Sequence, residues 1–265
     1  MQLNNKLDFF KVFSLGNGFA NKIWFFLLYI VLRVKRLIGL PTSFNTPIKI
    51  RLNFKGRSFN FYIKYILDFH LLKEIFIDEI YKHQIEGTPD VILDAGSNIG
   101  ASVVYFKLLY PNSKVFAIEP HHGCIEVLHE NAKDFNIEVV SAALSDHDGV
   151  DKFYFNDEHW SASLFDRGRG SKPIDVRTIS LDSFLKEFNI DKVDIFKMDI
   201  EGAEFDVFKV FNQRYKINIL LGELHPKITN KTINDFKLLI PDFELIDSRD
   251  EGGHINVLFK RKESL

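Results

Sequence analysis

The sequence is nearly devoid of cysteine. Cys124 stands alone among 265 residues, which excludes an intramolecular disulfide and agrees with a reducing compartment. An excess of charge of either sign is missing too, because the formal net charge is −2, so the composition gives no reason to expect nucleic acid as a partner. What is present is apolar: 46% hydrophobic residues beside 26% charged ones are enough for a substantial globular core.

A long hydrophobic run is also missing. Residues 23–32 are unbroken apolar, but this is about half of what a membrane-spanning helix needs, and no small-residue cleavage site makes it a secretory signal. Arg33, Lys35 and Arg36 follow directly. Two interpretations stay open: packing within the protein or in a homodimer, or contact with a membrane interface. We therefore expect a cytoplasmic protein, with peripheral contact of residues 23–36 to the inner face of the membrane as the open alternative.

A complete dinucleotide fingerprint is the third thing missing. Residues 91–100 read Val-Ile-Leu-Asp-Ala-Gly-Ser-Asn-Ile-Gly, an apolar strand and a turn with glycines at Gly96 and Gly100. Asn98 stands where Gly-x-Gly-x-x-Gly needs its middle glycine, so the backbone is less free to approach a pyrophosphate. Glu119 ends the next apolar run, where a carboxylate can accept both hydroxyls of a ribose. Together these residues favour a nucleotide-type cofactor over a plain turn.

A later segment narrows this interpretation to a family. Residues 194–204 read Asp-Ile-Phe-Lys-Met-Asp-Ile-Glu-Gly-Ala-Glu and resemble the Lys-x-Asp-x-Glu-Gly-x-Glu segment of the FkbM methyltransferases. Four further motifs stand in the order that this family uses: Asp-Ala-Gly-Ser-Asn-Ile-Gly, Ala-Ile-Glu-Pro, Ala-Leu-Ser-Asp-His-Asp-Gly and Gly-Glu-Leu-His-Pro. The resemblance covers roughly residues 70–260. It implies S-adenosylmethionine as the cofactor and O-methylation of a sugar, glycan or natural-product hydroxyl as the reaction.

From residue 89 onward the pattern predicts an α/β fold. Apolar strands alternate with helices, which favours a parallel sheet with helices on both faces. The expected parallel strands are 91–94, 114–119, 138–143, 194–199 and 217–223, and the expected helices are 99–110, 122–135 and 202–212. The resemblance implies that strands 243–247 and 254–260 pair antiparallel and complete the mostly parallel seven-stranded sheet of a Rossmann-like class I methyltransferase. Residues 89–265 would then be the S-adenosylmethionine-binding domain.

Residues 1–88 are expected to form an N-terminal extension. It would contain the apolar and basic helix, a β-hairpin within residues 48–63 and an amphipathic helix at 69–82, placed as a lid or shoulder over the cofactor domain. Residues 150–190 make an unusually long crossover, so we expect acceptor recognition there. Trp160 in this segment is either a stacking platform for a sugar ring or a hydrophobic plug. Ser163, three residues later, is a further candidate contact of the acceptor.

Ligands of open α/β sheets bind beyond the carboxyl ends of the strands, so the residues that close each strand are the candidates. The resemblance assigns Asp94, Gly96, Asn98 and Gly100 to the methionine end of the cofactor, Glu119 to the ribose, and Ser141 and Ala142 to the adenine. For Glu119 the alternative is a carboxylate that interacts with the start of the following helix.

Asp199 and His225 are the candidate catalytic residues. His225 suits a general base because its unperturbed pKa lies near neutrality, although a lone histidine is often structural. An acidic set surrounds them in the sequence: Asp199, Glu201, Glu204 and Glu223. It could hold a divalent cation, contact the acceptor or cap a helix, and Lys197 is expected to neutralise one member. Glu201 and Glu223 complete the candidate acceptor contacts, and the need for a metal stays unknown.

Two other functions stay open. One is a nicotinamide-dependent oxidoreductase on the same fold, although Asn98 and the acidic set speak against it. The other is a membrane-associated binding protein that retains the fold without turnover, which the apolar and basic stretch 23–36 supports.

Overall fold

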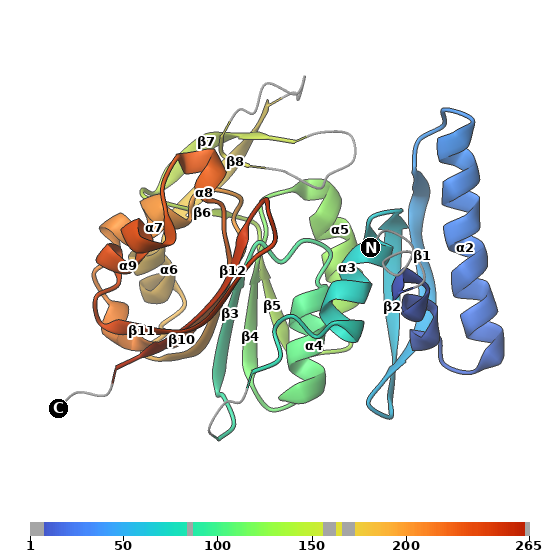
Figure 1. Ribbon diagram of the computed structural model, residues 1–265, viewed down its shortest axis with the longest axis horizontal. Helices are drawn as coiled ribbons and strands as arrows, with labels where there is room; N and C mark the ends of the chain where they lie inside the picture. Colours follow the sequence, from blue (N-terminus) through green and yellow to red (C-terminus); the bar gives the residue numbers. More distant parts are fainter. Residues whose placement is uncertain (1–7, 84–86, 156–162, 166–172, 263–265) are drawn as a thin grey trace.

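A seven-stranded sheet forms the centre of the molecule in the computed structural model, which describes residues 8–83, 87–155, 163–165 and 173–262 (Figure 1). Its strand order is β11-β12-β10-β9-β3-β4-β5. The parallel strands are β3 (Val91–Ala95), β4 (Lys114–Ile118), β5 (Ile137–Val140), β9 (Val193–Met198) and β10 (Ile217–Leu224). β12 (Ile255–Arg261) and β11 (Phe243–Asp250) join antiparallel. The predicted class I methyltransferase sheet with its closing antiparallel hairpin is thus confirmed.

Helices cover both faces of this sheet, which explains the apolar strands. β9 is buried along its whole length, as expected for a parallel strand covered on two sides. One face carries α4 (Ala101–Leu109) and α5 (His122–Ala132). The other carries α6 (Leu181–Glu187), α7 (Glu204–Val210) and α9 (Ile233–Leu239), with η3 (Arg214–Lys216) and α8 (Pro226–Thr229) in the connections. Figure 1 shows the two helical layers on opposite sides of the strands.

The N-terminal extension packs on the α4 and α5 side. It consists of η1 (Phe10–Leu15), α2 (Phe19–Leu37) and the hairpin of β1 (Ser43–Phe54) and β2 (Arg57–Tyr65), which pair as predicted with Ile48 opposite Ile63. One hydrophobic cluster runs from α2 through the hairpin to α4 and α5. The extension is therefore a shoulder that shares its core with the sheet. Within the described residues, the structure contains no helix of the length and apolarity that crossing a membrane requires.

The amphipathic helix predicted at 69–82 is shorter and irregular. It consists of α3 (Asp68–Leu72) and a π-helical turn, η2 (Lys73–Ile77). Glu79 has a φ of 47°, a left-handed conformation that a right-handed helix cannot continue through. The chain beyond residue 77 is thereby redirected toward the carboxyl ends of the central strands, and Ile80 and Tyr81 line the cavity described below.

The strand predicted at 138–143 is in fact two strands in two sheets. β5 ends at Val140, and β6 (Ala143–Ser145) leaves the central sheet to pair with β8 (Pro173–Ser180). β7 (Gly149–Tyr154) pairs antiparallel with β8, so these strands make a separate three-stranded sheet. Sequence patterns gave no sign that the strands of this crossover form their own sheet.

Candidate functional site

A cavity of about 900 Å³ lies at the carboxyl ends of the central parallel strands. The turns after β3 and β4 form one side, and residues after β9 and β10 form another. Residues of η2 and of the β11–β12 hairpin complete the wall. Its size suits a nucleotide-type cofactor together with part of a second ligand.

The turn after β3 touches the backbone at the end of β9. Gly96 has a φ of 77°, and a Cβ atom there would lie 1.8 Å from the carbonyl oxygen of Asp199. The amide of Asp199 donates to the carbonyl of Ala95 across 3.0 Å. Asn98 takes a left-handed conformation with a φ of 49°, which asparagine tolerates better than most residues, and Gly100 precedes α4 with a φ of 90°. This turn thus positions Asp199 as well as shaping the cavity.

Glu119 connects the turns after β3 and β4. Its Oε2 accepts a hydrogen bond from the amide of Asn98 and its Oε1 one from the amide of His121, each 2.9 Å long. The side chain is buried, and burial raises its pKa to about 7. Each carboxylate oxygen has a second lone pair, so Glu119 can still accept hydrogen bonds from a ligand in the cavity. His121 is the N-cap residue of α5, so Glu119 also interacts with the start of this helix, the alternative role given above.

Lys197 forms a buried ion pair that the sequence did not reveal. Its Nζ lies 3.0 Å from Oδ1 of Asp94 and donates to the carbonyl of Gly96 across 2.8 Å. Burial alone would lower the pKa of Lys197, but the negative charges of Asp94, Asp199 and Glu223 together outweigh it and raise that pKa. The direct partner of Lys197, Asp94, is outside the acidic set, but the charges of Asp199 and Glu223 also act on this ammonium, so neutralisation of one member of the set stays a prediction. Asp94 is fully buried beneath the turn and is not among the described residues that line the cavity.

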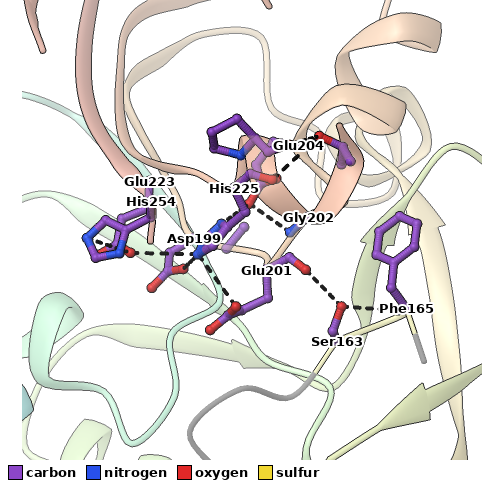
Figure 2. Close-up of polar contacts among 12 residues, drawn as sticks. Ser163, Phe165, Asp199, Glu201, Gly202, Glu204, Glu223, His225 and His254 are labelled. Carbon is purple, nitrogen blue, oxygen red and sulfur yellow. Dashed lines mark hydrogen bonds and ion pairs between the residues drawn. The ribbon is translucent and has the colours of Figure 1, made fainter. Parts of the chain in front are cut away.

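His225 lies between carboxylates on both sides of its ring (Figure 2). Its Nδ1 is 2.8 Å from Oε1 of Glu204, which also accepts from the amide of Gly202. Its Nε2 is 3.5 Å from Oε2 of Glu201 and 4.0 Å from Oδ1 of Asp199. Burial would lower the pKa of His225, but the Glu204 hydrogen bond and the surrounding carboxylates raise it to about 9. At neutral pH the imidazole is therefore protonated.

Glu223 and His254 extend this cluster. Oε2 of Glu223 lies 3.8 Å from Nε2 of His225 and 3.4 Å from Nε2 of His254. Burial, followed by the charge of Asp199, raises the pKa of Glu223 to about 9. Burial and the neighbouring His225 lower the pKa of His254. His254 comes from the β11–β12 hairpin, which sequence patterns did not connect with the site.

Two groups in this cluster have the ligand types of a divalent metal site. The first group is Glu223, His225 and His254, and the second is Asp199, Glu201 and His225. Within each group the ligand atoms lie within 4.8 Å of one another. Both share His225, whose second ring nitrogen bonds Glu204, and such a carboxylate partner is typical of metal-binding histidines. The residues present therefore fit a divalent cation chemically.

Of the other residues predicted for the site, only some line the cavity among the described residues. Ala142 lines the cavity, whereas Gly100 and the exposed Ser141 are not among its described lining residues. Ser163 is buried, and its hydroxyl donates to the carbonyl of Glu201 across 2.8 Å and accepts from the amide of Phe165. Ser163 thus supports the loop after β9, and the neighbouring Leu164 lines the cavity. Trp160 lies outside the described residues.

Sequence patterns also missed part of the cavity wall. Glu74 from η2 lines it, and burial, followed by the charge of Asp199, raises its pKa to about 7. Tyr81 and Arg249 line it as well. The sequence analysis did not identify these residues, because none of them belongs to one of the motifs.

Comparison with known proteins agrees with the motif order. The model of the methyltransferase FkbM domain family matches residues 94–249. Methyltransferase sdnD of Sordaria araneosa is 26% identical to the chain over 55% of it and 69% of the relative. The 2-O-methyltransferase NoeI of Sinorhizobium fredii is 28% identical over 66% and 81%, respectively. The hexuronic acid methyltransferase AglP of Haloferax volcanii is 26% identical over 56% and 63%.

Proposed function

Because the chain belongs to the FkbM methyltransferase domain family, we propose that it transfers the methyl group of S-adenosylmethionine to a hydroxyl of a sugar, glycan or natural product. One observation carries the proposal: a single cavity joins the turn after β3 and Glu119 to the cluster around His225. The relatives named as a 2-O-methyltransferase and a hexuronic acid methyltransferase support a sugar hydroxyl as the acceptor. Family membership speaks against the nicotinamide-dependent alternative.

The cofactor would occupy the end of the cavity formed by the turns after β3 and β4. When bound, it supplies an electrophilic methyl group on a sulfonium. Glu119 accepts the ribose hydroxyls, Ala142 forms the wall for the adenine, and the backbone at Gly96 and Asn98 admits the methionine moiety. Asp94 acts from below by holding Lys197 against the turn. Direct contacts of Asp94, Gly100 and Ser141 with the cofactor stay predictions.

The acceptor would lie against Asp199, Glu201 and Glu223. Asp199 and Glu201 accept hydrogen bonds from its hydroxyls, whereas Glu223, whose carboxyl keeps its proton at neutral pH, donates one. Nε2 of His225 receives the proton of the hydroxyl that attacks the methyl. His225 is protonated at neutral pH, so it must lose its proton before it can act. Positive charge that a ligand brings into this acidic cluster lowers the pKa of His225 and frees Nε2. Trp160 as an acceptor contact also stays a prediction.

A divalent cation is the second role that we propose for the same cluster. The shared nitrogen of His225 and the carboxylate partner on its other nitrogen favour it. A cation held there would orient two neighbouring hydroxyls of the acceptor and supply Lewis acidity. In that case Nε2 of His225 binds the cation and does not accept the proton, so the effect of a chelator on transfer distinguishes the two roles.

The proposed transfer is tested with radiolabelled S-adenosylmethionine and a panel of acceptors: uronic acids, neutral oligosaccharides and hydroxylated polyketides. We expect label to move to one acceptor class, with S-adenosylhomocysteine formed in equal amount. Transfer that persists in excess EDTA assigns His225 as the base. Transfer lost in EDTA and restored by Mg²⁺ or Mn²⁺ assigns the cation role. Failure of the protein to bind either S-adenosylmethionine or S-adenosylhomocysteine in calorimetric titration contradicts the function.

Cofactor affinity should depend on pH through Glu119. The pKa of this carboxyl is raised to about 7, so it is protonated below that pH, whereas accepting two ribose hydroxyls requires the carboxylate. We expect the Kd for S-adenosylmethionine to rise about tenfold for each pH unit below 7 and to level off above it. Calorimetric titration at about pH 5.5 to 8.5 measures this dependence, because the range covers both sides of the Glu119 pKa of about 7.

Two variants make the pH test specific. Glu119→Gln should bind weakly at every pH and show a flat profile. Glu138→Gln changes a half-exposed carboxyl on β5, away from the cavity, and should keep the profile of the unchanged chain. A sloping profile in Glu119→Gln would show that another group causes the pH dependence.

A further inference from the structure

α2 is apolar on the side that faces away from the protein. Its inner side packs Phe25, Leu28 and Leu32 into the core, where each is almost fully buried. On the opposite side, Ile23, Trp24, Leu27, Ile30, Val31 and Val34 are between 38% and 48% exposed. We call these six residues the outer apolar face. Figure 1 shows α2 at the edge of the molecule, beyond the hairpin, where no described segment covers it.

The arrangement of this face is regular. Ile23, Leu27, Ile30 and Val34 recur at intervals of four, three and four residues, so they form one stripe along the helix. None of the six residues is charged. Monomeric proteins normally expose large apolar side chains singly, and a continuous rimmed stripe marks an interaction surface.

Basic residues border the stripe. Lys22 and Arg33 are exposed on one side of it, and the guanidinium of Arg33 lies 5.9 Å from the centre of the Tyr29 ring. Arg36 is exposed at the C-terminal end of the helix but follows the buried Leu32 by four residues, so it lies on the inner side. Within the part of the chain that the structure describes, these three side chains form no ion pair. Long cationic side chains beside an apolar stripe suit a helix that lies in a lipid interface, because their alkyl stems pack on apolar surface while their charges reach the headgroups.

Charge in the sequence is divided sharply between this unit and the rest. Residues 9–67, which form η1, α2 and the hairpin, contain ten Lys or Arg residues and no Asp or Glu. The whole chain sums to −2, so all other residues together carry −12. A second copy docked face to face through α2 would bring two such cationic units together, which charge repulsion opposes. An anionic lipid surface complements both the apolar stripe and its charge.

We propose that the outer apolar face of α2 docks the protein on an anionic membrane, with the helix lying in the interface. The stripe enters the boundary between headgroups and acyl chains, and Lys22 and Arg33 contact the acidic headgroups. This proposal concerns a surface separate from the cavity and does not depend on the proposed reaction.

Flotation of the full-length protein with vesicles tests the docking. One set contains phosphatidylcholine alone and the other equal amounts of phosphatidylcholine and phosphatidylglycerol. We expect binding to the anionic set to be at least tenfold stronger and to weaken when salt is raised from about 0.1 M to about 0.5 M. Trp24 fluorescence should shift to the blue on binding, and a Trp24→Phe variant should lose the shift, which separates this signal from that of Trp160.

Surface variants locate the contact. Leu27→Ser with Val34→Ser should reduce binding at least tenfold, and Lys22→Gln with Arg33→Gln should remove the preference for anionic vesicles. Leu238→Ser on α9 replaces an apolar residue that is 79% exposed elsewhere and should change nothing. Circular dichroism checks that each variant stays folded.

Three results overturn the proposal: equal binding to both kinds of vesicle, no binding to either, or full binding by the Leu27→Ser and Val34→Ser variant. A dimer in sedimentation velocity that the same variant dissociates would assign the face to a second copy instead.

Discussion

His225→Asn should reduce methyl transfer by about 10²- to 10⁴-fold, the usual contribution of a positioned general base. The asparagine side-chain amide can still donate to Glu204 from near the position of Nδ1, so the start of α7 should stay in place. Asparagine has no nitrogen in the position of Nε2, so the proposed base is lost. We therefore expect the affinity for S-adenosylmethionine to stay close to that of the unchanged chain. Initial rates of label transfer to the acceptor found in the screen, together with calorimetric titration of the cofactor, measure the two effects separately.

The control for this variant is His147→Asn. His147 is an exposed histidine that contacts Asp146 and is not among the described residues lining the cavity, so its replacement should leave the rate unchanged. A loss of less than about tenfold in His225→Asn would show that the residue is structural. A parallel loss of cofactor affinity would place its effect on binding and not on proton transfer.

Gly96→Ala should weaken cofactor binding by at least about 100-fold and lower the free energy of unfolding by about 3–5 kcal/mol. The new Cβ atom would lie 1.8 Å from the carbonyl oxygen of Asp199, and this atom belongs to the backbone, so no side-chain rotation relieves the contact. The turn after β3 must then separate from the end of β9. Urea titration followed by circular dichroism measures the stability, and calorimetry measures the affinity.

Gly56→Ala isolates the cause of that effect. Gly56 has a φ of 81°, close to the 77° of Gly96, but an added Cβ would meet no atom within 4 Å. We expect a loss of about 1–2 kcal/mol, the ordinary cost of a left-handed conformation, and unchanged cofactor affinity. Equal losses in both variants would show that the φ angle alone, and not the contact between the two turns, explains the requirement for glycine.

The sequence predicted the features of the fold that depend on local pattern. The apolar strands before Asp94, Glu119 and Asp199 were recognisable because each is a short run that ends in a polar residue. Parallel strands place such ends at one edge of the sheet, so the approximate position of the site followed from topology. The motif order then supplied the family, which the match over residues 94–249 confirms.

The features that the sequence did not predict depend on contacts between distant segments. Lys197 stands two residues before Asp199, but its direct ion pair is with Asp94, because β9 lies beside β3. His254 reaches His225 because β12 pairs with β10 in one particular register. Neither contact has a local signature. The raised pKa of His225 is a further example, because it depends on the carboxylates around the ring, which the reference pKa of histidine does not include.

One hydrophobic core is shared by α2, the hairpin, α4 and α5, and it extends beyond the residues that the family match covers. The family match begins at residue 94, at the end of the first central strand. The hydrophobic core does not begin there, because α4 and α5 share one buried cluster with Phe61, Ile63 and their neighbours in the hairpin. A shortened chain that kept the matched residues alone would expose this apolar side to water. The stretch of chain that the family match covers is therefore shorter than the stretch that encloses this core.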